Sequence, residues 1–174
     1  MSQFDTNWSF INNGNLIPKG FYFAGISAGL KISKKKDLAL ILAPEGSICS
    51  GMFTQSTVRA SCVEICEQRI KRCSGLVRAI LINSGQANAC TGNFGTQHFL
   101  TATSKVSELL GIEEKEVLMC STGVIGVPIQ INDLVQKLPK LVGELKVNSF
   151  QNAADAILTT DLTCKKISIE TNIE

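Results

Sequence analysis

The chain has 174 residues, of which 44% are hydrophobic and 18% are charged, and its formal net charge is +2. This apolar content excludes a disordered chain. The near-neutral charge disfavours the dense basic surface on which non-specific nucleic-acid binding depends. The length suits a single domain over residues 1–174, with a sizeable core.

The sequence also bears on location and on metal binding. No apolar run approaches the roughly 18 residues of a membrane helix, and residues 1–5 lack the basic and then apolar pattern of a signal peptide. We therefore expect a cytoplasmic protein with neither a membrane nor a nucleic acid as its partner. Seven scattered cysteines indicate reduced, mostly buried thiols, and with His98 as the only histidine we expect no metal site.

The first half of the chain is typical of strands. We predict strands over residues 20–29 and 38–43, and another around Val63 and Ile65, which alternate with polar neighbours. For the lysine-rich residues 34–37 we favour a solvated hairpin tip over an anion site. Residues 77–83 indicate a buried strand, and residues 84–95 a loop.

In the second half, helices alternate with strands. Apolar residues from Phe99 to Leu110 recur at helical spacing, with Gly111 as the expected C-terminal cap. A strand over 116–120 and a turn over 121–123 precede a second helix, which carries Leu134, Val135, Leu138 and Leu141 and which Pro139 should kink or divide. A third helix should start at Ser149 and bury Phe150, Ala153, Ala154 and Ile157. Ile167 and Ile169 then indicate a last strand, and this order of elements predicts a layered α+β or α/β sandwich.

Familiar catalytic motifs are missing from the sequence. His98 lies inside a helical pattern, and no G-x-S-x-G segment accompanies it, so we interpret it as a helix-face residue. Neither G-x-G-x-x-G nor a P-loop motif occurs. Nothing in the sequence therefore predicts a histidine-based or nucleotide-binding site.

Three glycine- and hydroxyl-rich segments could instead bind a ligand. Residues 83–92 are rich in amides, and we favour a tight connection whose amides satisfy its own backbone. In residues 121–126, the Thr122 hydroxyl beside the Gly123 N–H could stabilise an oxyanion, although a plain turn is the commoner use. Thr159, Thr160 and Asp161 could bind an amino-acid-like substrate or could cap the preceding helix.

Six segments stand in collinear order along nearly the whole chain. They are Gly20-Phe21 with residues 24–31 (AGISAGLK), residues 37–41 (DLALI), Phe53-Thr54, residues 78–80 with 83–92 (RAI, NSGQANACTG), residues 117–118 with 121–126 (VL, STGVIG), and residues 156–161 (AILTTD). Together they resemble the ornithine acetyltransferase family, also called glutamate N-acetyltransferase. The resemblance implies an α+β fold, a layered α-β-β-α sandwich completed by a second (β) chain.

The same resemblance implies a reaction. The family moves an acetyl group from N-acetylornithine to glutamate in arginine biosynthesis, and some members also use acetyl-CoA as a substrate; no cofactor is expected. A precursor cuts itself at a Met-Ala-Thr step, and the new N-terminal threonine of the β chain is the nucleophile. Its own amine serves as the base, so that no histidine is needed. An α2β2 heterotetramer is the implied assembly.

Residue roles follow from the matching positions. Thr122 and Gly123 stand where the family has its oxyanion hole, and Thr159 stands at a substrate contact, with Thr160 and Asp161 in supporting roles. Asn83, Ser84, Gly85 and Asn88 are expected to shape a loop. Gln86 and Leu162 occupy positions where the family often has Asn and Thr, respectively. Because the sequence ends at Glu174, before the Met-Ala-Thr step, the expected protein is an α chain that is inactive alone.

Two alternatives remain open at this stage. A self-processing aminopeptidase or amidase subunit would also expose an N-terminal nucleophile. A truncated binding or structural fragment would have no activity.

Overall fold

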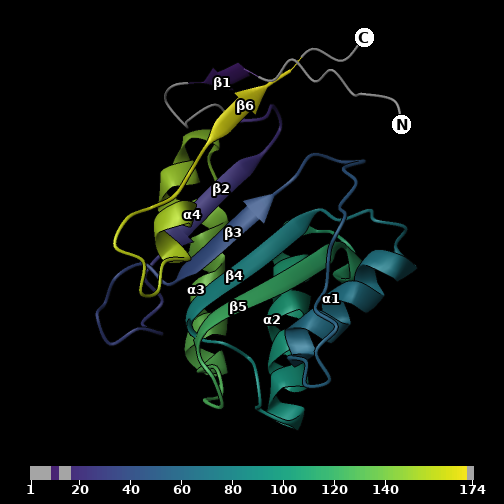
Figure 1. Ribbon diagram of the computed structural model, residues 1–174, viewed down its shortest axis with the longest axis vertical. Coiled ribbons are helices and arrows are strands. Elements are labelled where there is room, and N and C mark those ends of the chain that lie inside the picture. The colour runs from purple at the N-terminus through teal and green to yellow at the C-terminus, as the bar shows by residue number, and fades with distance from the viewer. Residues whose placement is uncertain (1–8, 12–16, 172–174) are drawn as a thin grey trace.

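The structure is a computed structural model that describes residues 9–11 and 17–171 (Figure 1). Residues 1–5, on which the expectation about a signal peptide depends, lie outside these ranges. Among the described residues, no helical segment combines the length and the hydrophobicity of a membrane span.

A four-stranded sheet forms the centre of the molecule. Its strands, in the order β2-β3-β4-β5, are β2 (Tyr22–Ile26), β3 (Leu38–Leu42), β4 (Ala79–Gln86) and β5 (Val117–Val124). The strands β2, β3 and β4 pair antiparallel, whereas β4 and β5 run parallel. The strands predicted within 20–29, 38–43, 77–83 and 116–120 are confirmed. Short apolar runs of this length are typical of strands.

Two helices cover one face of this sheet, α2 (Asn93–Leu110) and α3 (Ile131–Gly143) (Figure 1). Gly111 ends α2 in the left-handed conformation, with φ 65° and ψ 36°, as predicted. Pro139 lies inside α3 and does not divide it. The core between the helices and the sheet is formed by fully buried side chains that include Leu38, Leu40, Leu81, Met119, Phe99, Val106, Leu134 and Leu138.

The short helix α4 (Phe150–Ala156) lies against the opposite face, over β2 and β3. Ala153 and Ala156 pack on Phe23 and Ala39. A Cβ at Gly25 would lie 2.0 Å from the Asn152 carbonyl oxygen, so the absence of a side chain at Gly25 permits this close approach.

Two details of α4 differ from the prediction. A 3₁₀ turn, η2 (Val147–Ser149), leads into the helix, and Ser149 occupies the N-cap position without a side-chain capping bond. The expectation that Ile157 is buried is wrong: its side chain is 41% exposed, because the helix ends at Ala156.

The strand expected around Val63 and Ile65 is wrong, because these residues belong to the helix α1 (Ser61–Arg72). This helix buries Cys62, Cys66 and Arg69, a spacing of three to four residues that is helical. The Cys66 thiol donates to the Met119 carbonyl oxygen at 3.4 Å, so α1 lies along the free edge of β5.

A separate two-stranded sheet brings the two ends of the described chain together. Its strands β1 (Ser9–Ile11) and β6 (Ser168–Glu170) pair antiparallel (Figure 1). The final strand predicted at Ile167 and Ile169 is confirmed for Ile169 and its neighbours. Both isoleucines are exposed, however, and Ser168 is the buried residue of β6.

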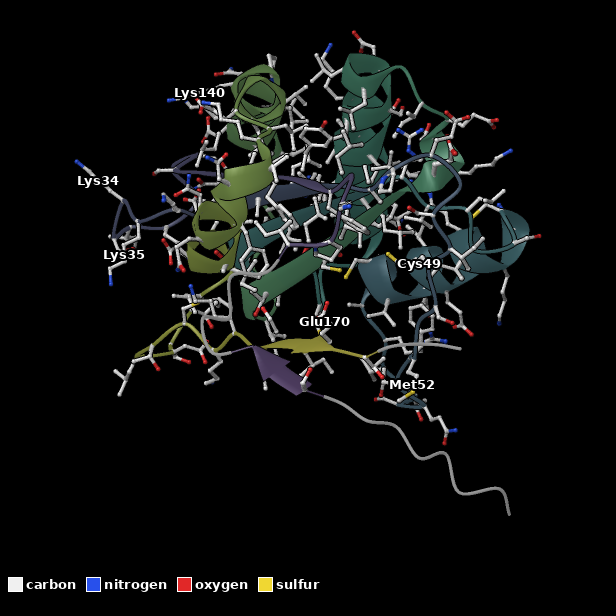
Figure 2. All side chains as sticks on the ribbon, turned by 90° about the horizontal axis from the view of Figure 1, so that it is seen from above. Lys34, Lys35, Cys49, Met52, Lys140 and Glu170 are labelled. Atoms are coloured by element: carbon white, nitrogen blue, oxygen red, sulfur yellow. The ribbon has the colours of Figure 1, made fainter. Side chains whose placement is uncertain are left out.

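The predicted α+β class is confirmed, with a helical layer formed by α2 and α3 on one face of the central sheet. On the other face, α4 covers β2 and β3. Figure 2, which views the molecule along the sheet, shows the β1–β6 pair on that side. Ile41, Ile80 and Ile82 on this face are only partly buried, and Cys120 is exposed.

Candidate active site

The candidate site lies where the parallel strands β4 and β5 end. Both strands extend further than the sequence predicts, β4 to Gln86 and β5 to Val124. The expectations of a turn at 121–123 and of a loop from residue 84 are therefore wrong at these positions. The turn comes later, at residues 125–126. The carboxyl ends of parallel strands meet at one edge of a sheet, where ligands commonly bind.

A cavity of about 760 Å³ opens at this edge. It brings together four of the five predicted site residues: Thr122 and Gly123 from β5, and Thr159 and Thr160 from the segment that follows α4. The other lining residues are Leu30, Lys31, Ile32, Ser33, Gly85, Gln86, Val124, Val127 and Gln130. Segments distant in the sequence thus form one site with a mixed polar and apolar wall.

Gly123 packs directly on the backbone of β4. It stands opposite Gly85 in the parallel register, and both residues have positive φ, 125° at Gly85 and 135° at Gly123. A Cβ at Gly123 would lie 2.3 Å from the Gly85 carbonyl carbon, and one at Gly85 would lie 3.0 Å from the Leu30 carbonyl oxygen. Glycine at both positions therefore has a structural reason independent of any ligand.

The strand β5 also has an edge that faces away from the sheet. Alternate residues of an edge strand point their peptide groups outward. The carbonyls of Val117 and Met119 accept hydrogen bonds from α1 on this side. By the same alternation we expect the Gly123 N–H on this edge, and Thr122, which also lines the cavity, directly precedes Gly123. This arrangement fits a pair of donors for an oxyanion.

The amide-rich segment 83–92 is held by hydrogen bonds within it and to neighbouring segments. The Asn83 side chain donates to the Gln86 carbonyl at 3.0 Å and accepts from the Ser121 hydroxyl at 2.6 Å. The Asn88 amide donates to the Gly95 carbonyl at 3.1 Å, and the Ser84 hydroxyl donates to the Ala156 carbonyl. The favoured interpretation, amides that satisfy the local backbone, fits these contacts.

Lys31 connects two walls of the cavity. Its ammonium group donates to the Lys36 carbonyl at 3.0 Å and to the Leu158 carbonyl, next to Thr159. The fully buried Asp37 carboxylate accepts from the backbone N–H of Ala28 at 2.6 Å and of Lys31 at 3.0 Å, which closes the loop between β2 and β3. Burial lowers the pKa of Lys31, whereas the charge of Asp37 opposes that shift.

Asp161 does not line the main cavity. It lies on an adjoining cavity of about 470 Å³, and its exposed carboxylate accepts from the Lys165 ammonium at 2.5 Å. That hydrogen bond lowers the pKa of Asp161. Asp161 therefore lies outside the main cavity, whereas Thr159 lines both cavities.

His98 and the thiols lie away from the cavity lining. The ring centroids of His98, on α2, and Phe94 are 5.9 Å apart, and burial lowers the pKa of His98. All seven cysteines are free, but only Cys62, Cys66 and Cys73 are buried, so the expectation of mostly buried thiols is wrong. Within the described ranges, no group of three His, Cys, Asp or Glu side chains could hold a metal ion.

Comparison with known proteins places this geometry in a family. The sequence model of the ArgJ family matches residues 22–174. The chain belongs to the ArgJ family. The arginine biosynthesis bifunctional protein ArgJ of Prochlorococcus marinus subsp. pastoris is 74% identical over 164 residues, which are 94% of this chain and 41% of that protein.

Two solved ArgJ-type structures share the fold. The arginine biosynthesis bifunctional protein ArgJ of Bacillus halodurans superposes with a TM-score of 0.88 at 28% identity, over 97% of this chain and 88% of the solved chain. The ornithine acetyltransferase of Mycobacterium tuberculosis, solved with ornithine, gives a TM-score of 0.85 at 31% identity, over 94% of this chain and 87% of the solved chain. The ornithine acetyltransferase resemblance inferred from six segments is thereby confirmed.

The chain spans about two fifths of the curated ArgJ proteins that it matches, 41% for two of them, but most of the solved ArgJ-type chains. The solved chains are thus much shorter than the curated proteins. Sequence reasoning gave no role to Lys31, which it included only as part of a matching segment. A lysine six residues before a buried aspartate, in a glycine-flanked loop, is the signal that could have drawn attention to it.

Proposed function

We propose that this chain is the α chain of a glutamate N-acetyltransferase, which moves an acetyl group from N-acetylornithine to glutamate in arginine biosynthesis. The observation that carries the proposal is the single cavity that gathers Thr122, Gly123, Thr159 and Thr160 in a chain of the ArgJ family. We place the enzyme in the cytoplasm, and it requires no cofactor. Acetyl-CoA is the second donor that we propose to test.

The proposed chemistry needs a nucleophile from a partner. The N-terminal threonine of a β chain attacks the acetyl carbonyl of N-acetylornithine through its hydroxyl oxygen, and its own α-amine takes the hydroxyl proton. The carbonyl carbon–nitrogen bond then breaks, the leaving amine takes that proton, and an acetyl-threonine ester remains. Attack by the glutamate amine breaks the ester and returns a proton to the threonine oxygen.

Thr122 and Gly123 act on the charge that develops in both steps. The carbonyl oxygen becomes negative in each tetrahedral intermediate, and the Thr122 hydroxyl and the Gly123 N–H are the donors that we assign to it. Fixed donors lower the barrier because they need no reorganisation when the charge appears. We assign substrate contacts to Thr159 and Thr160, and an indirect role to Asp161 through the adjoining cavity.

The incompletely covered face of the sheet supports a partner chain. A sheet buries both faces in a layered fold, yet here Ile41, Ile80 and Ile82 border two shallow apolar grooves of about 280 and 230 Å³. A second sheet from the β chain would cover these residues and complete the α-β-β-α sandwich, and two such pairs would form the α2β2 assembly. The relatives' greater length supplies the sequence for such a chain.

A hydrolase subunit, such as an aminopeptidase or amidase, is the second candidate, because its nucleophile could be generated in the same way. No observation in the cavity favours water over an amine as the acceptor. We therefore retain this candidate as an outcome of the test.

The test uses the α chain produced together with the rest of its precursor. The purified enzyme is incubated with N-acetylornithine, with and without glutamate, and then with acetyl-CoA and glutamate. We expect acetylglutamate only when glutamate is present, together with an acetyl group on the N-terminal threonine of a second polypeptide. Release of acetate at equal rates with and without glutamate would support the hydrolase instead.

A further inference from the structure

The main cavity has a single charged side chain in its wall. Among the described residues that line it, only Lys31 carries a charge; the others are apolar, hydroxyl, amide or glycine residues. Both proposed amino-acid substrates carry an α-carboxylate, and glutamate carries a γ-carboxylate as well, so a cavity that binds either substrate must accommodate at least one negative group. A partly buried ammonium group is a strong donor to such a carboxylate.

The position of this ammonium group is fixed by the protein. Two of its three N–H donors are engaged, by the Lys36 and Leu158 carbonyl oxygens. Both acceptors are neutral, and no further acceptor in the described residues takes the third N–H. Asp37, whose charge raises the pKa of Lys31, uses its two oxygens for the backbone N–H groups of Ala28 and Lys31.

The stem of Lys31 runs beside the glycine pair of β4 and β5. A Cβ built at Gly85 would contact the Lys31 Cγ at 3.5 Å, and Gly85 stands opposite Gly123. At its other end, Lys31 bonds the carbonyl of Leu158, directly before Thr159. Lys31 thus lies where the main cavity meets the adjoining one: it lines both cavities, and the two residues whose carbonyls hold its ammonium group, Lys36 and Leu158, line the adjoining cavity.

From this geometry we propose that the third N–H of the Lys31 ammonium group binds the α-carboxylate of the amino-acid substrate in the main cavity. The assignment rests on the proposed acetyl transfer and adds a binding residue to it. The direction of the electrostatics agrees, because burial lowers the pKa of Lys31 and an arriving carboxylate, like Asp37, favours its charged form.

The other lysines of the loop provide a matched control. Lys34 and Lys35 extend from the edge of the molecule into solvent (Figure 2), and Lys34 does not line the main cavity. The substitution Lys34→Met removes the same charge from the same loop as Lys31→Met does, without removing a cavity donor.

The test compares N-acetylornithine with its α-carboxamide as acetyl donors for glutamate, using the assembled enzyme. We expect Lys31→Met to lower kcat/KM for the carboxylate substrate roughly 10- to 100-fold, the range for a hydrogen bond to a charged group, and to change that for the carboxamide by less than about threefold. Lys34→Met should leave both values at the wild-type level, and Lys31→Arg should recover part of the loss.

Equal losses of kcat/KM on both donors would overturn the assignment, because they would indicate a purely structural role. A second measurement needs no variant: the unmodified enzyme must prefer the carboxylate to the carboxamide, and equal use of both would also overturn it. Absence of any transfer to glutamate by the unmodified enzyme would contradict the proposed function itself. If the unmodified enzyme transfers acetyl to glutamate but Lys31→Met lowers kcat/KM equally for both donors, only the role of Lys31 is contradicted.

Discussion

Gly85 and Gly123 face each other across the parallel strands β4 and β5, and a Cβ at Gly123 would lie 2.3 Å from the Gly85 carbonyl carbon. The donor assigned to the oxyanion is therefore carried by a residue whose lack of a side chain also lets two strands approach. Loss of activity on substitution of Gly123 cannot by itself demonstrate catalysis.

Replacement of Gly123 by Ala should destabilise the protein strongly. The new methyl group would overlap β4 backbone, which cannot move without breaking the sheet, so we expect a loss of about 4 kcal/mol or more in the free energy of unfolding. Gly126→Ala is the control, because Gly126 has φ 79° but nothing within 4 Å of its Cβ position. Gly126→Ala should lower the free energy of unfolding by about 1–2 kcal/mol, from backbone strain alone. Urea denaturation of both variants measures the difference, and equal losses would contradict the close approach.

Thr122 is the cleaner probe of the oxyanion site. Its side chain is partly exposed, and removal of its hydroxyl leaves no backbone clash. We expect Thr122→Ala to lower kcat roughly 100-fold or more, as loss of one oxyanion donor does elsewhere. The free energy of unfolding should change by less than about 1 kcal/mol. Thr122→Ser, which keeps the hydroxyl, should retain most of the turnover. A stability loss that accounts for the whole loss of activity would contradict this role.

The strands that the sequence predicts well are those with an uninterrupted apolar run. Residues 38–42 are such a run, and the structure has a strand there. Val63 and Ile65 alternate with polar residues, which indicated a strand. The decisive pattern there is the helical spacing of Cys62, Cys66 and Arg69, and a buried arginine is not counted as a core residue when only apolar side chains are considered.

The site was predictable in composition but not in shape. Thr122-Gly123 and Thr159-Thr160 were identified from local motifs, and the cavity brings them together. The strand conformation of Thr122 and Gly123 was not predictable, because it depends on pairing of β5 with the parallel strand β4, which extends to Gln86. Asp161 lies on the adjoining cavity and bonds Lys165 in the same exposed segment, and no periodic pattern in the sequence reveals this placement.

Arg69 should be a major contributor to stability. Its guanidinium group donates to the Glu114 carbonyl at 2.8 Å, to the Val117 carbonyl at 2.6 Å and to the Glu114 carboxylate at 2.7 Å, and it lies 4.8 Å from the Phe99 ring centroid. Arg69→Met removes these donors and leaves buried carbonyls unpaired, so we expect a loss of about 3 kcal/mol.

The matched control for this prediction is Arg72→Met. Arg72 is exposed in the last turn of the same helix, and its replacement should change the free energy of unfolding by less than about 0.5 kcal/mol. Thermal denaturation of the two variants, followed by circular dichroism, compares them. Similar melting temperatures would show that the Arg69 contacts contribute little.

The buried thiol of Cys66 should make the protein sensitive to alkali. Burial raises its pKa from 9.0 to about 12, so the folded protein holds a proton that the unfolded chain releases. Because the folded-state pKa is the higher one, the stabilisation is fully present below pH 9 and is lost progressively as the pH rises from 9 to about 12. The urea concentration at the unfolding midpoint is measured at pH 8 and at pH 10.5. Between these two pH values it should fall steeply for the unmodified protein and less steeply for Cys66→Ala. Cys90→Ala, which changes an exposed thiol, should retain the steep decline. An equally steep decline in Cys66→Ala would assign the alkaline sensitivity to other groups.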